Sequence, residues 1–199
     1  PPRRGRRHLI ARRAIAALAG AAALLAGGGC TSDLARFERT LAARDSATAA
    51  LGQWCAARAL AQPPVIRAER IGGEPAAPTP QVRALLAVPL GERLALRHVR
   101  LSCGGAVLSE AWNWYVPARL PASMNAVLDG SDTPFGTVIA PLGFTRQRLA
   151  SQRGAAAGCP PGTVLSHRAV LRLPDGRPVS LVTECYTHAN LRATRRAAN

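Results

Sequence analysis

The sequence contains no lysine: all 26 of its basic residues are arginine, against 11 acidic residues, and the net charge is +15 at pH 7. Such an excess of positive charge attracts anionic partners such as nucleic acid, membrane surfaces or small carboxylates. However, the arginines are scattered along the chain, and no zinc finger, RNA-binding signature or basic helix is visible. The pattern therefore favours a GC-rich coding sequence over a nucleic-acid-binding protein.

Aromatic residues are also scarce, since they make up only 4% of the 199 residues. Three of them cluster at Trp112, Trp114 and Tyr115, and Phe135 follows in the segment TPFG. Alternate residues of a strand point to opposite faces, so Trp112 and Trp114 should share one face and Asn113 and Tyr115 the other. We interpret the cluster either as the wall of a ligand cavity or as plain core packing.

Several motifs of catalysis and metal binding are missing. The sequence has no P-loop, no dinucleotide-binding fingerprint and no nucleophile elbow. No cysteine lies in a CxxC or Cys/His spacing, so no zinc site is expected. Apart from Cys30, an even number of cysteines remains, which allows either two disulfides in one of three pairings or free buried thiols: Cys55, Cys103, Cys159 and Cys185.

Residues 1–30 have the anatomy of an export signal. Arginines come first, an apolar run covers 14–26, and small residues follow. That run is shorter than the roughly 20 residues that span a bilayer. Cys30 after three glycines resembles the lipid-accepting cysteine of a bacterial lipoprotein, so a lipid on Cys30 would attach the protein to the membrane. An amphipathic helix or an uncleaved anchor are the alternatives. We expect an exported protein, periplasmic or membrane-anchored, whose folded domain is 31–199.

The remaining sequence predicts an α+β fold with an antiparallel sheet and flanking helices. Apolar spacings indicate two helices over 32–60, with Asp45–Ser46 as the N-cap between them. Shorter helices are predicted over 121–130 and, as helix or turn, over 81–89, while 133–143 is a turn followed by a helix or strand. The predicted strands are 61–71 and two hairpins, 92–117 with a Gly-Gly turn and 163–188 with a Pro-Asp-Gly turn.

Two charged residues interrupt apolar strand patterns: Arg97 in LALRHV and Glu184 in VSLVTECY. A buried arginine is costly without a carboxylate, and burial raises the pKa of a glutamate. If both face one cavity, the arginine fork could hold an aromatic carboxylate, and the glutamate could meet a hydroxyl or ether oxygen and serve as an acid. The alternative is that each points to solvent. Arg119 and Arg146 could add positive potential nearby.

Three blocks of the sequence, over roughly 33–191, resemble the successive blocks of chorismate pyruvate-lyase: LRHVRLSCGGAVLSEAWNWYVP, SDTPFG and HRAVLRLPDGRPVSLVTECYT. The short RDSATAAL is similar to the helix start that precedes them. Some bacterial transcription regulators share this fold in their ligand-sensing domains. The resemblance implies an enclosed ligand cavity and a carbon–oxygen lyase that cleaves chorismate to 4-hydroxybenzoate and pyruvate, with no metal and no organic cofactor.

The resemblance also implies residue roles. Arg97 would bind the substrate carboxylate, and Glu184 would contact the ring oxygen and assist departure of the enolpyruvyl group. Phe135 stands where an apolar family residue offers its backbone N–H to the ligand. Ala47 stands where the family has a methionine lining the pocket. At both positions the side chain differs from that of the family. Ala47 would enlarge the cavity, and Phe135 would fill part of it.

An export signal conflicts with a lyase function, because chorismate is made in the cytoplasm. We therefore carry three hypotheses. The first is a lyase acting on chorismate or a related acid, and the second is a non-catalytic periplasmic protein that binds a small aromatic carboxylate. The third is a structural lipoprotein whose cavity has closed. His98, His167 and His188 are interpreted as structural or exposed residues rather than proton carriers.

Overall fold

A computed structural model describes residues 32–72 and 77–192. The predicted export signal over 1–30, with Cys30, lies outside the described residues. In the ranges that are described, no helix combines the length and the hydropathy that a membrane crossing requires.

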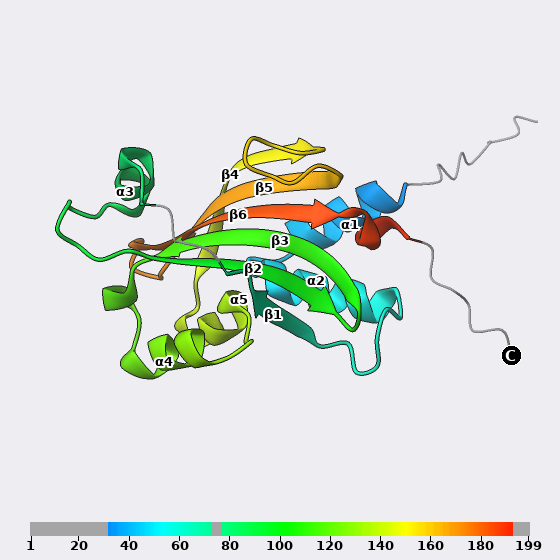
Figure 1. The fold of residues 1–199 in the computed structure, drawn as a ribbon, viewed down its shortest axis with the longest axis horizontal. Helices are drawn as coiled ribbons and strands as arrows, with labels where there is room; N and C mark the ends of the chain where they lie inside the picture. Colours follow the sequence, from blue (N-terminus) through cyan, green and yellow to red (C-terminus); the bar gives the residue numbers. More distant parts are fainter. Residues whose placement is uncertain (1–31, 73–76, 193–199) are drawn as a thin grey trace, which may run out of the picture. The chain divides into compact units, whose positions relative to one another are not determined.

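One six-stranded antiparallel sheet organises the described chain, in the order β1-β2-β3-β6-β5-β4 (Figure 1). The strands are β1 (Ile66–Arg70), β2 (Ala95–Cys103), β3 (Ala106–Tyr115), β4 (Thr145–Arg153), β5 (Thr163–Arg172) and β6 (Pro178–Thr187). The fold is therefore α+β with an antiparallel sheet, as predicted. Both predicted hairpins are present, and β3 of the first pairs with β6 of the second.

The turn of each hairpin follows from its residues. Gly104 starts the turn between β2 and β3 with a φ of 55°, a conformation that glycine adopts without steric cost. Between β5 and β6, the backbone N–H of Arg177 donates to Asp175 Oδ1 at 2.9 Å, and Gly176 has a φ of 84°. Local turn chemistry thus sets the register of both hairpins.

Within 32–72 and 77–192, five α-helices flank the sheet: α1 (Asp33–Ala42), α2 (Ala47–Ala57), α3 (Pro80–Leu86), α4 (Ala122–Gly130) and α5 (Phe135–Val138). Short 3-10 turns are η1 (Pro117–Arg119), η2 (Ala140–Leu142) and η3 (His188–Leu191). The predicted cap between the first two helices is confirmed, because the Ser46 hydroxyl accepts from the backbone N–H of Ala49 at 3.2 Å. Ser32 caps α1 in the same way.

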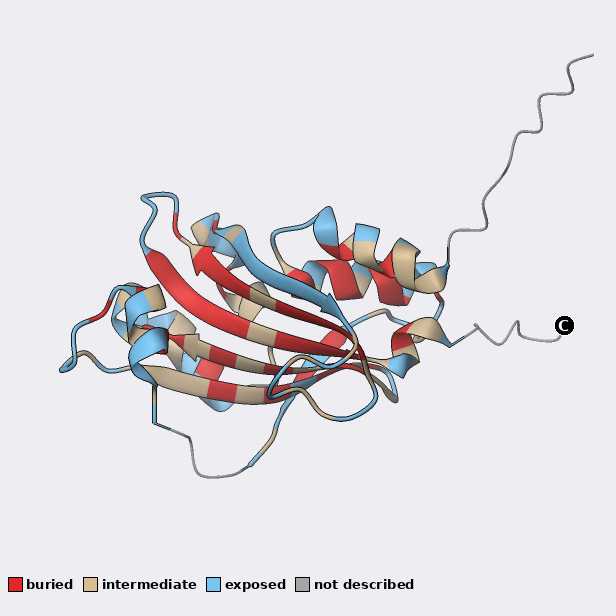
Figure 2. Cartoon of the chain, turned by 90° about the horizontal axis from the view of Figure 1, so that it is seen from above, coloured by how far each residue is buried: buried red, intermediate tan, exposed pale blue. Residues whose placement is uncertain are grey.

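The helices divide between the two faces of the sheet. Phe37 of α1 and Trp54 of α2 pack with strand residues such as Val99 and Tyr186, and α4 and α5 pack farther along the same face. We term this side the helix face. On the opposite side, the outer face, α3 packs against Leu181 and its neighbours. Figure 2 shows the central strands of the sheet as largely buried and the edge strand β4 as exposed.

The edge strand β4 was not predicted. It is exposed along almost its whole length, so it lacks the apolar alternation by which a strand is recognised. Its pairing with β5 contains a bulge between Arg148 and Ala150, a feature that blunts exposed sheet edges.

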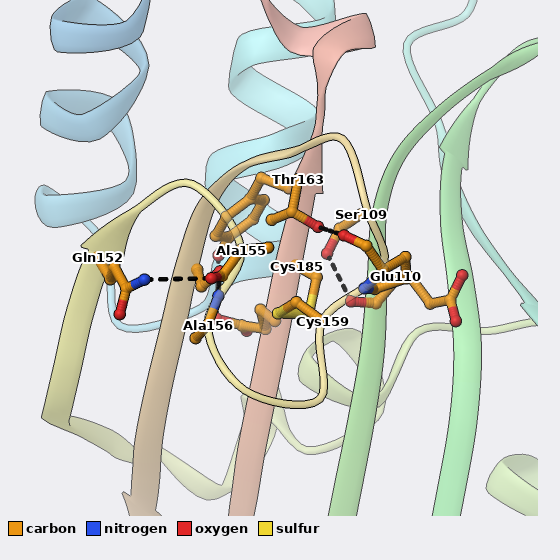
Figure 3. Close-up of a disulfide and its surroundings, with 12 residues drawn as sticks. Ser109, Glu110, Gln152, Ala155, Ala156, Cys159, Thr163 and Cys185 are labelled. Atoms are coloured by element: carbon orange, nitrogen blue, oxygen red, sulfur yellow. Dashed lines mark hydrogen bonds between the residues drawn. A yellow bond between two sulfur atoms is a disulfide. The ribbon is translucent and has the colours of Figure 1, made fainter.

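Two disulfides tie the loops and helices to the sheet. Cys55–Cys103 joins α2 to β2, and Cys159–Cys185 joins the β4–β5 loop to β6 (Figure 3). Their Cα–Cα distances of 6.3 Å and 5.6 Å lie within the usual range for disulfides. Of the alternatives that the sequence left open, the structure has the two-disulfide arrangement and no free buried thiols among these four residues.

Candidate functional site

Arg97 and Glu184 both lie on the helix face and both are buried, with 4% and 5% of their surfaces exposed. The alternative that they point to solvent is therefore wrong. They do not come from neighbouring strands, because β3 lies between β2 and β6. Arg97 pairs with Asn113 of β3, whereas Glu184 pairs with Ala111, two residues along the same strand.

The partner of Glu184 is Arg146, at the start of β4. Both N–H groups of the Arg146 fork donate to the carboxylate, with Nη1 3.2 Å from Oε1, and the Tyr186 hydroxyl donates to Oε2 at 2.9 Å. Burial lowers the pKa of Arg146, but the charge of Glu184, its hydrogen bond to Arg146 and the neighbouring Tyr186 and Asp45 together outweigh burial and hold the pKa above its usual value. Arg146, considered above only as a source of positive potential, is thus an integral part of the site.

Arg97 has no such partner. Its Nη1 donates to the carbonyl of Thr133 at 3.2 Å and its Nη2 to the carbonyl of Ser131 at 3.4 Å. Among the described residues, no carboxylate oxygen lies within 4 Å of this guanidinium, and its buried Nε makes no hydrogen bond. Burial lowers the pKa of Arg97. A desolvated guanidinium without a counter-charge is unusual, because buried charges are normally paired.

The neighbour of Arg97 across the sheet has an unsatisfied donor as well. Asn113 accepts a hydrogen bond from the Ser180 hydroxyl through Oδ1, while its Nδ2 is buried without a partner among the described residues. Directly opposed side chains of an antiparallel pair lie about 5 Å apart at Cβ. Two neighbouring residues on the helix face therefore each have a buried N–H donor without a partner among the described residues.

A cavity of about 50 Å³ lies beside these donors, between the sheet and the start of α2. Ala47 and Phe135 line it, and so do Asn113, Arg146 and Glu184. Arg97 stands next to Asn113 but is not among the residues that line the cavity. The other walls are mainly apolar: Val99, Leu101, Ala111, Phe144, Leu171 and Val182.

The turn 131–136 separates this cavity from an outer cleft of about 480 Å³. Ser46, Thr48 and Gly136 border both spaces. A Cβ on Gly136 would lie only 2.8 Å from Ser46 Oγ and 3.0 Å from Thr48 Oγ1, so glycine allows the turn to press against the start of α2. The carbonyls that Arg97 holds belong to the same turn.

The aromatic cluster is split between the two faces, as the alternation predicts. Tyr115 lies on the helix face, with its ring 5.3 Å from that of Phe135. Trp112 and Trp114 lie on the outer face, so the interpretation that they wall this cavity is wrong for both. Trp112 instead stacks on His98, with ring centroids 4.3 Å apart.

The histidines do not enter the cavity. His167 is buried on the helix face, where burial lowers its pKa to about 4, and its ring packs edge-on against Tyr186 at 5.3 Å. His98 Nε2 lies 2.8 Å from a carboxylate oxygen of Glu110 on the outer face. His188 begins η3. The described ranges contain no group of three metal-ligating side chains.

No family model matches the sequence. The uncharacterized protein y4mC of Sinorhizobium fredii is 39% identical over 174 residues, which cover 78% of this chain and 73% of that protein. This chain belongs to the y4mC family.

Comparison with solved structures gives the fold of this family member. PhnF of Mycobacterium smegmatis matches with a TM-score of 0.51 at 13% identity, over 78% of this chain and 70% of PhnF. Its effector domain alone matches with a TM-score of 0.45 at 12% identity, over 61% of this chain and 80% of that domain. YydK of Bacillus subtilis, described as a possible transcriptional regulator, matches with a TM-score of 0.45 at 15% identity over 67% of this chain, and the chain spans 62% of its length. The fold is that of regulator effector domains, consistent with the chorismate lyase-like architecture implied by the sequence blocks.

Proposed function

We propose that the protein binds a small carboxylate with an attached ring on the helix face of its sheet. The observation that carries the proposal is that Arg97 and Asn113, which pair across the sheet, each have a buried N–H donor, Nε and Nδ2, that makes no hydrogen bond among the described residues. A carboxylate could accept from both and would supply the charge that Arg97 lacks. Hydrogen bonds between charged groups are stronger than neutral ones, which favours an anionic ligand over a neutral acceptor.

The remainder of the cavity suits a ring that carries a polar group at its far end. Phe135, Phe144 and Val182 offer apolar surface next to Asn113. The Arg146–Glu184 pair lies farther along the sheet and could meet a hydroxyl or ether oxygen. This arrangement supports an aromatic or cyclohexadienyl acid such as 4-hydroxybenzoate or chorismate.

Entry of such a ligand requires the turn 131–136 to move. The cavity of about 50 Å³ is far smaller than the roughly 300–1,000 Å³ of typical ligand pockets. Arg97 is bound to this turn only through two long hydrogen bonds to carbonyls. A ligand carboxylate would compete for the same guanidinium, release the turn, and join the cavity to the outer cleft.

Binding without catalysis is the form of the proposal that the contacts favour. A lyase of the chorismate type would use Glu184 to assist the leaving group. Here both oxygens of Glu184 already accept hydrogen bonds, from Arg146 and from Tyr186. The two disulfides support placing this binding in an oxidising compartment such as the periplasm.

The test is a thermal-shift series on the full chain. A ligand at 100 times its Kd that binds only the folded state stabilises it by about 2.7 kcal/mol. For a protein of this size, that corresponds to a rise in Tm of about 5–10 °C. We expect such a rise with 4-hydroxybenzoate for the wild type and for Arg36→Gln, an exposed control on α1, and none for Arg97→Gln.

The same samples separate binding from catalysis. On incubation with chorismate we expect a thermal shift and no 4-hydroxybenzoate product. Product formation that is lost in Arg97→Gln and in Glu184→Gln would replace the binding hypothesis with the lyase hypothesis. Absence of a shift with every carboxylate would refute both and leave a structural role.

A further inference from the structure

The outer face of the sheet has a groove of about 620 Å³ that the proposed function does not use. The groove lies between α3, which contributes Gln81 and Val82, and the β4–β5 loop, which contributes Ala156 and Gly158. Its volume falls within the range of roughly 300–1,000 Å³ in which small-molecule sites occur. The helix-face cavity is more than ten times smaller.

A row of side chains across three strands forms the floor of the groove. Trp112 of β3 pairs with Thr183 of β6, which pairs in turn with Arg168 of β5. Neighbouring strands are about 4.8 Å apart, so the indole and the guanidinium arise from positions about 10 Å apart on the same face. Trp114 lies two residues along from Trp112 and continues the aromatic surface. The floor is thus aromatic at one end and cationic at the other.

The cationic end of the row is uncompensated. Arg168 is half-buried, and its hydrogen bond to Gln81 Oε1 is long at 3.5 Å. No carboxylate oxygen lies within 4 Å of it in the described ranges. On this face, the nearest acidic residue in the pairing pattern is Glu110, which is already engaged by His98 and Arg100. An anion in the groove would therefore find Arg168 without a competing carboxylate.

The aromatic end is held in place. The Trp112 ring stacks on His98, which is itself bound to Glu110 at 2.8 Å. Trp114 packs against the apolar cluster that includes Val82 of α3. Both indoles also line the groove, so their contacts with neighbouring residues hold the aromatic surface in position.

The loop wall is fixed as well (Figure 3). The Cys159–Cys185 disulfide anchors it to β6, and Gln152 Nε2 donates to the carbonyl of Ala155 at 3.1 Å. The Ser166 hydroxyl accepts from the N–H of Ala156 at 2.9 Å and donates to the carbonyl of Gly154 at 2.7 Å. The groove is therefore a preformed site, which lowers the entropic cost of binding.

We infer that this groove binds an acidic oligosaccharide. The apolar C–H face of a pyranose ring packs on an indole, and the carboxylate of an acidic sugar pairs with Arg168 through charge-assisted hydrogen bonds. The groove also has hydroxyl and amide side chains, interspersed with apolar residues, that suit sugar hydroxyls: Thr79, Gln81, Gln152 and Thr183. The open form of the groove, with hydrogen-bonding groups beside its aromatic surface, favours a saccharide over an aromatic acid, which would need an enclosed apolar pocket.

The experiment titrates trigalacturonic acid into the full chain and follows the indole N–H signals by NMR. The fully methyl-esterified trisaccharide, which has no charge, is the control. Signals of Trp112 and Trp114 should move, whereas that of Trp54, buried in the core, should not. Loss of a charge-assisted hydrogen bond reduces affinity by about 10- to 100-fold. We expect a loss of that size for the ester and for Arg168→Gln, and a change below about twofold for Arg177→Gln, an exposed arginine at the β5–β6 turn.

Trp112→Ala should abolish binding of the trisaccharide. Thr183→Val is a second test that does not depend on the folding of Trp112→Ala: it leaves both indoles in place and should weaken binding. Arg97→Gln should bind the trisaccharide like the wild type, which separates this site from the helix-face cavity. The assignment is overturned if the acid and its ester bind equally, if Arg177→Gln loses as much affinity as Arg168→Gln, or if no indole signal moves. Arg168-dependent binding of 4-hydroxybenzoate at Trp112, with none of the trisaccharide, would overturn the saccharide class.

Discussion

Removal of one partner from the Arg146–Glu184 pair should destabilise the protein more than almost any other single substitution. Their side chains are only 6% and 7% exposed. A buried charge left alone costs about 3–5 kcal/mol. In Arg146→Met, the described contacts leave Glu184 with the Tyr186 hydroxyl as its hydrogen-bond donor. We therefore expect a loss of about 3–5 kcal/mol, or about 6–20 °C in Tm.

The double variant tests whether the two buried charges depend on each other. Glu184→Met alone should cost a similar amount, because it leaves the Arg146 fork buried. Replacing a whole buried ion pair by apolar residues is often neutral, so Arg146→Met/Glu184→Met should lie within about 2 kcal/mol of the wild type. The coupling energy of the cycle should then reach at least about 4 kcal/mol.

The assay is urea unfolding followed by tryptophan fluorescence with the disulfides intact, so that m-values can be compared. Equal m-values for all four proteins would validate the cycle. Additive effects of the two substitutions, or single losses below about 1 kcal/mol, would refute the description of this pair as buried and mutually dependent.

Three further predictions test other parts of the structure. Burial lowers the pKa of His167 from 6.5 to about 4, so below pH 6.5 the unfolded chain binds a proton that the folded chain rejects. The free energy of unfolding, measured in urea, should thus fall by about 2 kcal/mol from about pH 7.5 to pH 5. An equal fall in the His167→Gln variant would contradict this explanation. The Cys55–Cys103 disulfide spans 48 residues, so its replacement by two alanines should cost about 4 kcal/mol in urea unfolding, and a loss below about 1 kcal/mol would count against it. Gly136→Ala should lower the free energy of unfolding by about 1–2 kcal/mol because the new methyl group would meet the Ser46 side chain. When Gly136→Ala is introduced into the Ser46→Gly variant, this loss, measured by thermal unfolding, should be smaller.

The elements that were predicted correctly are those that a local sequence pattern identifies without knowledge of the tertiary structure. The hairpin over 163–188 has apolar alternation on both arms and a turn that requires Asp175 and Gly176. Ser46 marks a helix start through a contact three residues away. Strand β4 has neither signal, because its partner β5 supplies the hydrogen bonds and all of its residues except Arg146 are exposed.

The same limit applies to the candidate site. Arg97 and Glu184 could be identified because a charge in an apolar strand is locally conspicuous. Arg146 lies 38 residues from Glu184 in the sequence, on a strand without a pattern, so their pairing depends on sheet order. The alternation placed Trp112 and Asn113 on opposite faces correctly. It could not show which face of the sheet the helices cover, and so it could not show that Trp112 and Trp114 lie outside the helix-face cavity.

The central claim is that Arg97 and Asn113 together receive a carboxylate. Isothermal titration of 4-hydroxybenzoate into the wild type, Arg97→Gln, Asn113→Leu and the Arg36→Gln control tests it most directly. The account predicts an affinity at least about tenfold weaker for Arg97→Gln, a smaller loss for Asn113→Leu, and no change for the control. Equal affinities for the wild type and Arg97→Gln would contradict it.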